Sequence, residues 1–236
     1  MPRSRVPLSL LAVLLATLGA CHSAPERAGQ LACTLVLIKT GSRTEPLSKE
    51  ENTKAFAGHF ANMERLAKAG HLLVAGPYGE GRSDKALRGI FVLDTPDRAR
   101  ARELAESDPA FQAGVFLFEF HDFVTQAPLR AYIQDELAAR EAAERAGKKL
   151  SPGEGGRTYV WLTAVNGAEA AAALAGNPAV LLQARLDETK WFVLLDAVDV
   201  AAANALLEPL GARLGPYVLD GWFGSRKLTS LPQRQG

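Results

Sequence analysis

The sequence predicts an α+β fold in which two units, each with the element order βαββαβ, follow one another in a single chain. Short apolar runs alternate with stretches of helical length, and this order occurs twice. The triplet Phe-Val-Leu at 91–93 and at 192–194, and the glycines 114 and 215, share an offset of 101 residues. These observations indicate two copies of one ferredoxin-like unit rather than a solenoid.

Each predicted unit contains four strands and two helices. In the first unit the pattern predicts strands over 34–39, 71–75, 89–93 and 114–120, and helices over 49–69 and 96–107. In the second unit it predicts strands over 158–165, 180–186, 190–195 and 217–223, and helices over 168–175 and 200–210. Residues 130–149 are rich in Ala, Glu and Arg and predict a connecting helix with a narrow apolar stripe.

The strands also indicate how the units pack. A sheet with one wet face alternates apolar and polar residues, but LVLI, GIFVL, VFLF and WFVLL are nearly continuous apolar runs. Both faces of each sheet must therefore be covered. The helices of each unit cover one face, and we expect the sheet of the sister unit to cover the other. Face-to-face packing of the two sheets would enclose a chamber.

The amino terminus has the pattern of a secretory signal. Arg3 and Arg5 precede the apolar run 8–18, which is far shorter than the ~20 residues of a membrane-spanning helix. The following Leu18-Gly19-Ala20-Cys21 resembles the bacterial lipobox, which implies cleavage before Cys21 and lipidation of its sulfur. An ordinary signal peptide with an incidental Cys21 is the alternative. His22 stands where an aspartate would imply retention at the inner membrane, so the resemblance implies the periplasmic side of the outer membrane.

These patterns divide the chain into six segments. They are a signal peptide at 1–20, a tether at 21–32, a first domain at 33–125, a connecting helix and linker at 126–156, a degenerate second domain at 157–226 and a tail at 227–236. The Ser-Pro-Gly-rich run at 151–156 is the boundary before the second domain.

Composition excludes several classes of protein. With 27 Lys and Arg against 26 Asp and Glu, the formal charge is +1, which excludes a strongly basic nucleic-acid binder. The sequence has no G-x-S-x-G, Walker, C-x-x-C or H-E-x-x-H motif. The histidines form no close ligand pair, so we expect neither a metal nor a cofactor. Cys33 opens an apolar run and is interpreted as a small buried hydrophobe.

Four segments of the first unit carry a family resemblance. They are Gly58-His59-Phe60, Leu73-Val74-Ala75-Gly76-Pro77, Arg88-Gly89-Ile90-Phe91, and Asp108-Pro109-Ala110-Phe111 with Gly114. In this order, over residues 35–123, they resemble the YciI (YCII-related) family. The resemblance implies a dimeric α/β barrel, distantly similar to muconolactone isomerase, whose second half is here supplied within the chain, so that a monomer would suffice. It also implies a catalytic pair at His59 and Asp108. The reaction is unknown for most members, and one branch removes chloride from a chlorinated hydroxyquinol.

His59 and Asp108 each have a plain structural alternative. Phe56, Phe60, Met63 and Leu66 mark a buried stripe on the first helix, and His59 lies one turn from three of them. It therefore points inward, either as a core histidine with one hydrogen bond or as a general acid/base. Asp108 precedes a proline, which ends the second helix there, so its carboxylate could cap a short turn, serve catalysis, or do both.

Two further residues are candidates for substrate binding. Arg88 stands before a central strand and could bind an anionic group, although a solvated arginine at a strand end fits equally. Tyr78 lies in the glycine-rich loop 76–81, a candidate flap over a pocket. The second unit contains no histidine, and the 101-residue offset places Pro209 where Asp108 stands. We therefore predict one site per chain, with the second unit as lid and packing partner.

The leading hypothesis is a lipid-anchored envelope protein that performs small-molecule acid/base chemistry, such as isomerisation, elimination or hydrolysis. A non-catalytic module that binds a small aromatic or acidic ligand is the alternative. A third possibility is an envelope interaction protein with a vestigial pocket, which a filled space between the two sheets would favour.

Overall fold

The computed structural model describes residues 29–148 and 154–231. The signal peptide, Cys21 and His22 lie outside the described residues, as does the end of the tail. Within these ranges, no helix combines the length and apolarity that crossing a membrane requires.

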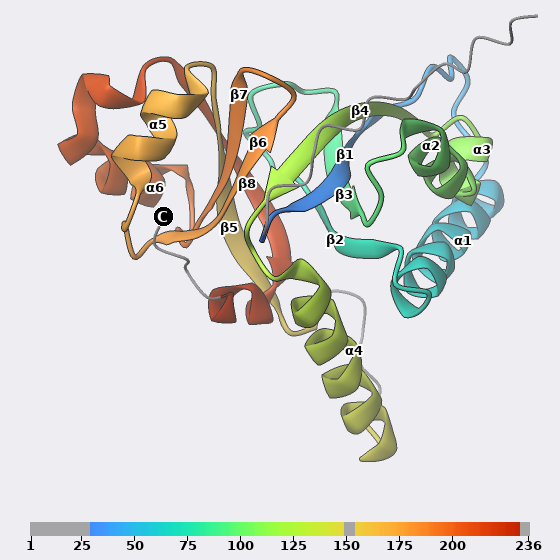
Figure 1. Cartoon of the computed structure of the whole chain (residues 1–236). Coiled ribbons are helices and arrows are strands. Elements are labelled where there is room, and N and C mark those ends of the chain that lie inside the picture. Colours follow the sequence, from blue (N-terminus) through green and yellow to red (C-terminus); the bar gives the residue numbers. More distant parts are fainter. Residues whose placement is uncertain (1–28, 149–153, 232–236) are drawn as a thin grey trace, which may run out of the picture.

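Eight antiparallel strands form one continuous sheet that curls into a nearly closed barrel (Figure 1). The strands are β1 (Leu31–Thr40), β2 (Leu72–Pro77), β3 (Leu87–Leu93), β4 (Phe116–Thr125), β5 (Gly156–Ala164), β6 (Val180–Leu186), β7 (Lys190–Leu195) and β8 (Tyr217–Ser225). Their order is β2-β3-β1-β4-β6-β7-β5-β8. Each half therefore has the same ferredoxin-like order, and the predicted α+β fold with an intrachain barrel is confirmed.

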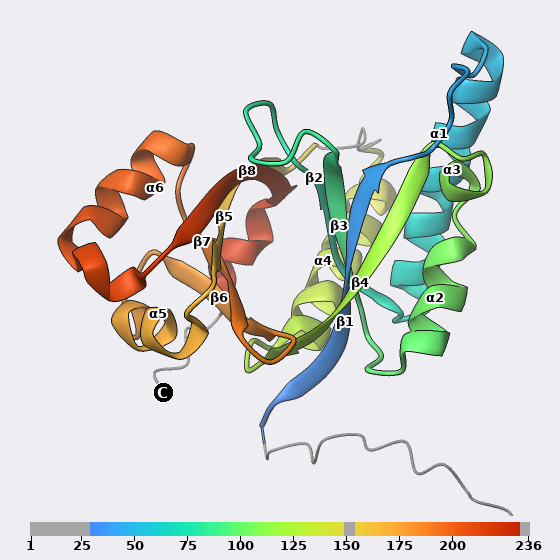
Figure 2. The same ribbon diagram turned by 90° about the horizontal axis from the view of Figure 1, so that it is seen from above.

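The helices cover the outside of the barrel (Figure 2). On the first half they are α1 (Lys49–Lys68), α2 (Arg98–Glu106) and α3 (Pro109–Gln112), and on the second half α5 (Gly167–Leu174), α6 (Val200–Leu207) and the 3-10 helix η1 (Glu208–Leu214). The connecting helix α4 (Leu129–Arg145) packs by its first turns and projects from the body, and the 3-10 helix η2 (Arg226–Ser230) follows β8. The connecting helix was predicted, but it ends four residues earlier than expected.

The two halves meet at two seams. At the first, β4 pairs with β6, with Phe123 opposite Leu186. At the second, Tyr78 bridges to Trp222 after the end of β2, and the Gly79 amide donates to the Gly221 carbonyl at 2.8 Å. A Cβ on Gly76 would overlap the Phe223 carbonyl oxygen, so β2 can approach β8 this closely only because Gly76 has no side chain.

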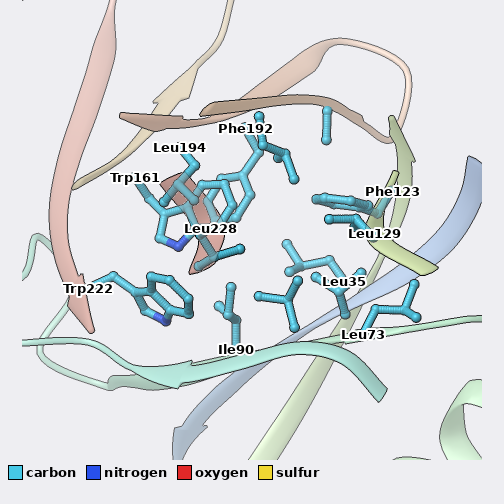
Figure 3. Packing of buried hydrophobic residues seen from close by; sticks show 14 of the residues in the cluster. Leu35, Leu73, Ile90, Phe123, Leu129, Trp161, Phe192, Leu194, Trp222 and Leu228 are labelled. Carbon is cyan, nitrogen blue, oxygen red and sulfur yellow. The ribbon is translucent and has the colours of Figure 1, made fainter. Parts of the chain in front are cut away.

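Apolar side chains from both halves fill the interior of the barrel (Figure 3). Leu35, Ile90 and Phe123 of the first half face Trp161 and Trp222 of the second. Each of these large side chains is almost fully buried, which stabilises the fold by roughly 1.5–3 kcal/mol per residue. The two sheets cover each other as predicted. The expectation of a chamber between them is wrong, because the apolar side chains that cover both faces occupy that space.

The inward face of α1 differs from the predicted stripe. Ser48 and Glu51 form a capping box that starts the helix. The buried residues of the helix are Ala55, His59, Asn62 and Leu66, which recur at helical spacing. The inward position of His59 is therefore confirmed. Phe60 was wrongly placed in the stripe, because its side chain is 48% exposed.

Candidate acid/base site

His59 of α1 and Asp108, which precedes α3, lie in direct contact. The His59 Nδ1 atom is 2.6 Å from the Asp108 Oδ2 atom, which is a short charge-assisted hydrogen-bond distance. His59 is 8% exposed and Asp108 is 0% exposed. The sequence reasoning named both residues, and the structure brings them together although 49 residues separate them in the chain.

A glycine allows the two segments to approach. A Cβ atom on Gly58 would lie 2.8 Å from the Cβ and Cγ atoms of Pro109, closer than real Cβ contacts. Glycine inside a helix costs about 0.5–1 kcal/mol relative to alanine. The benefit here is the close packing of α1 against Pro109, which places the neighbouring residues His59 and Asp108 within hydrogen-bond reach.

The two carboxylate oxygens of Asp108 have separate partners. Oδ1 accepts the backbone N–H of Ala110 at 2.8 Å and caps α3, while Oδ2 contacts His59. The sequence left open whether Asp108 caps a turn, serves catalysis or does both; the structure shows the cap and a contact with His59. The geometry shows both at once, because the proline that follows Asp108 holds its backbone extended and aims the carboxylate across the start of α3.

Four phenylalanine rings surround the imidazole. Phe56, Phe60, Phe91 and Phe116 have ring centroids 5.3–6.3 Å from that of His59, and Phe91 stacks on it. A carboxylate only accepts hydrogen bonds, so Nδ1 donates, and in the neutral ring Nε2 then carries the lone pair. Nε2 makes no hydrogen bond with any residue in the ranges that the structure describes. The arrangement is an oriented base in an apolar setting.

A polar network lies one helical turn further along α1. The Asn62 Oδ1 atom accepts from Arg65 at 2.6 Å, and Arg65 also donates to the Ser107 hydroxyl at 3.1 Å. The Asn62 Nδ2 atom is buried without a hydrogen-bond partner. The sequence reasoning missed these residues. The available signals were a polar residue three positions after His59 on the inward face and a serine directly before Asp108.

The pair lies on the helix-covered face of the first half, outside the barrel interior. Phe91 and Phe116, which contact His59, belong to the cluster that packs against α1 and α2, whereas Ile90 and Val92 belong to the interior cluster. The expectation that the two halves jointly enclose the acid/base groups is therefore wrong. Neighbouring residues of a strand face opposite sides, and a helix on the outside reaches only the outer set.

Tyr78 and Arg88 do not contact the pair in the described part of the chain. Tyr78 is buried in the barrel interior, where burial and then the charge of Asp220 raise the pKa of its phenol far above the usual value. Arg88 is exposed, and its Nε atom donates to the Thr40 hydroxyl at 2.8 Å.

The loop after Tyr78 docks on the second half. The Ser83 amide and hydroxyl donate to the two oxygens of Asp220 at 2.6 and 3.0 Å. Asp220 belongs to β8, and its side chain is buried. The loop therefore completes the seam between β2 and β8, and the expectation that it forms a flap over a pocket does not fit this attachment.

In the described ranges, no three His, Cys, Asp or Glu side chains cluster as a metal site would require. Cys33 is buried in the barrel interior, as interpreted from its apolar surroundings in the sequence.

Residues 34–119 match the YCII-related domain. His59 and Asp108 both lie inside this match, as do α1, α2 and α3. The match supports the YciI family for the first half, and the nearly closed barrel is consistent with the α/β barrel that this family implies. The second half lies outside the YCII-related match. Comparisons with curated proteins and with solved structures gave no match.

Proposed function

We propose that the YCII-related unit performs acid/base chemistry on a small molecule, with His59 carrying the proton. Isomerisation, elimination and hydrolysis are the reaction types that need only this equipment. The observation that carries the proposal is the 2.6 Å contact between His59 Nδ1 and the fully buried Asp108 carboxylate. Both residues lie within the YCII-related match, which is further support.

In the proposed step, His59 Nε2 accepts a proton from the substrate and later returns it. Asp108 accepts the Nδ1 hydrogen and so keeps the lone pair on Nε2. When the imidazolium forms, the buried carboxylate beside it stabilises the positive charge. Because Asp108 also caps α3, its side chain cannot rotate away, and it acts as a positioning residue. The step uses no cofactor, and neither Arg88 nor Tyr78 has a role in it.

The test is proton exchange in heavy water, followed by NMR. A panel of enolisable carbonyl compounds is incubated with the full chain, and loss of the C–H signals is recorded. We expect His59→Gln to reduce exchange by about 10²–10⁴-fold, the usual contribution of a general base. His71→Gln is the matched control, because His71 lies outside the pair and is only partly buried. Exchange that is the same in both variants and the parent would reject the proposal.

A non-catalytic small-ligand module is the second candidate. The observation that favours it is the enclosure of the imidazole, of which only 10% is exposed, by four phenylalanine rings. In that case a compound from the same panel would stabilise the chain against heat yet keep all its C–H signals in heavy water. Stabilisation together with exchange would favour the enzyme.

We also propose attachment to the cell envelope through a lipid on Cys21, on the periplasmic side of the outer membrane. The support is the basic start, the apolar run and the Leu-Gly-Ala-Cys sequence. Mass spectrometry of the amino-terminal peptide should show acylated Cys21, and Cys21→Ser should abolish the modification and release the protein from membranes. An unmodified Cys21 at the mature terminus would contradict this. Because the barrel closes within the chain, we further propose a monomer, which light scattering can measure.

A further inference from the structure

A cavity lies between α1 and α4, and neither His59 nor Asp108 lines it. Its volume is about 380 Å³, which is within the size range of small-molecule sites. Residues of α1, β2 and α4 line it, together with the chain around 154–156 and 223–225. β2 packs against both helices. The wall formed by α4 lies outside the YCII-related match, so this groove is a feature of the whole chain.

The groove has an apolar lining with two exposed aromatic rings. Phe60 of α1 is 48% exposed and Phe223 of β8 is 36% exposed, although most large apolar side chains of the described chain are buried. Met63 and Leu137, which are partly buried, extend the apolar surface along α1 and α4. Water-exposed phenylalanines inside a concave surface are typical of a site that binds an apolar body.

The charges around the groove are mostly negative. Five glutamates line it, against one lysine and one arginine. Glu64 pairs with Lys68 at 2.5 Å and Glu136 pairs with Arg140 at 3.0 Å, so both cations of the lining already have carboxylate partners. Glu141 pairs with Arg145 at 3.7 Å, whereas Glu144 has no ion pair in the described part of the chain.

The two helices are close enough for their charges to act across the groove. The hydrogen bond to Glu64 raises the pKa of Lys68, and the charges of Glu144 and Glu141 on α4 raise it further. A positive group near Lys68 and Glu144 would therefore be attracted by carboxylates of both α1 and α4.

We propose that this groove binds a small organic cation with an apolar body, such as an aryl or alkyl amine. The apolar part lies against Phe60, Met63 and Leu137, and the ammonium group lies near Glu144. The inference is independent of the acid/base chemistry, because binding is measured without turnover.

The test compares three probes that differ only in their head group: 4-phenylbutylamine, 4-phenylbutan-1-ol and 4-phenylbutyrate. Their binding to the full chain is measured by isothermal titration calorimetry at low ionic strength. We expect the amine to bind at least about tenfold more tightly than the carboxylate, with the alcohol between them. Added salt should weaken only the amine. Equal affinities of the three probes, or no binding of the amine, would overturn the proposal.

Substitutions then locate the site. Glu144→Gln should weaken the amine about two- to fivefold, the contribution of one exposed ion pair, and leave the alcohol unchanged. Asp135→Asn is the matched control on α4, because it removes the same charge outside this groove. Phe60→Ala should weaken all three probes, and its exposed position allows folding. Equal effects of Glu144→Gln and Asp135→Asn, or full binding in Phe60→Ala, would place the probes elsewhere.

Discussion

Asp108 has two functions that one substitution can separate. Asparagine caps a helix as well as aspartate does, so Asp108→Asn keeps the hydrogen bond from the Ala110 amide. It removes the negative charge beside His59 and replaces Oδ2 by an amide NH2 group, which donates to Nδ1 and so moves the imidazole hydrogen to Nε2. Asp108→Ala removes the cap and the acceptor together. Comparing the two variants therefore separates the stability of α3 from the support of the imidazolium.

The magnitudes follow from the contacts. Asp108→Ala loses a cap, about 1 kcal/mol, and leaves a buried Nδ1 donor unsatisfied at about 1–3 kcal/mol, for a total of about 2–4 kcal/mol. Asp108→Asn keeps the cap and, with the imidazole hydrogen on Nε2, a neutral hydrogen bond from its NH2 group to Nδ1, so it should cost no more than about 1 kcal/mol. Its effect on rate should be larger, because a charge-assisted bond of about 1.5–3 kcal/mol to the imidazolium corresponds to about ten- to a hundredfold.

Urea unfolding measures the first quantity, and proton exchange in heavy water measures the second. Asp108→Glu serves as an additional control, because it restores the charge with a longer side chain and should recover part of the rate. If Asp108→Asn unfolds as easily as Asp108→Ala, the division of tasks between the two oxygens is refuted. If Asp108→Asn exchanges protons at the parental rate, the carboxylate does not assist His59.

Three further predictions concern backbone contacts and pH. Gly58→Ala should destabilise the chain by about 1–3 kcal/mol in urea unfolding, because the added Cβ meets Pro109. It should also shift the NMR signals of His59, and unchanged signals would contradict the close contact. Gly76→Ala should accelerate hydrogen exchange of the Gly79 amide, because it forces β2 away from β8; unchanged protection would show that the seam tolerates a side chain. Burial raises the pKa of Asp187, but hydrogen bonds from His121 and from the Asp122 amide, with the charges of His121 and Arg98, lower it more. Since the pKa of Asp187 is lower in the folded than in the unfolded chain, ionised Asp187 stabilises the fold above about pH 4, and this stabilisation is lost on further acidification. The free energy of unfolding of Asp187→Asn, measured in urea, should therefore depend less on pH below about pH 4. An unchanged pH dependence would exclude Asp187 as the cause.

Much of the strand and helix order could be predicted from the sequence, because local signals determine it. Ser48 and Glu51 start α1, and Asp108 followed by Pro109 ends one helix and begins another. These signals involve residues a few positions apart. The contact between His59 and Asp108 was predicted through a family resemblance and not from spacing, since 49 residues separate the two.

The face on which the site lies could not be predicted, for a physical reason. Ile90, Phe91, Val92 and Leu93 are all buried and apolar, so none of these four residues marks the outer face. Only the strand pairing in the structure shows that Phe91 contacts His59, whereas Ile90 and Val92 face the barrel interior. The same limit applies to Phe60. Its position next to the buried face of α1 does not predict the groove between α1 and α4, because α4 comes much later in the chain.

The second half has the same strand order as the first but differs from it where the first half carries the His59–Asp108 pair. α5 has 8 residues where α1 has 20, and Pro209 of η1 stands at the 101-residue offset from Asp108. Without the second half, β2 and β4 would be open sheet edges, which promote association with other chains. In the observed fold β6 pairs with β4 and β8 lies against β2, so the second half covers both edges. Covering those edges requires strands and an apolar inner face, but neither a long helix nor a histidine. The features that the second half shares with the first, and those that it lacks, therefore both follow from one structural task.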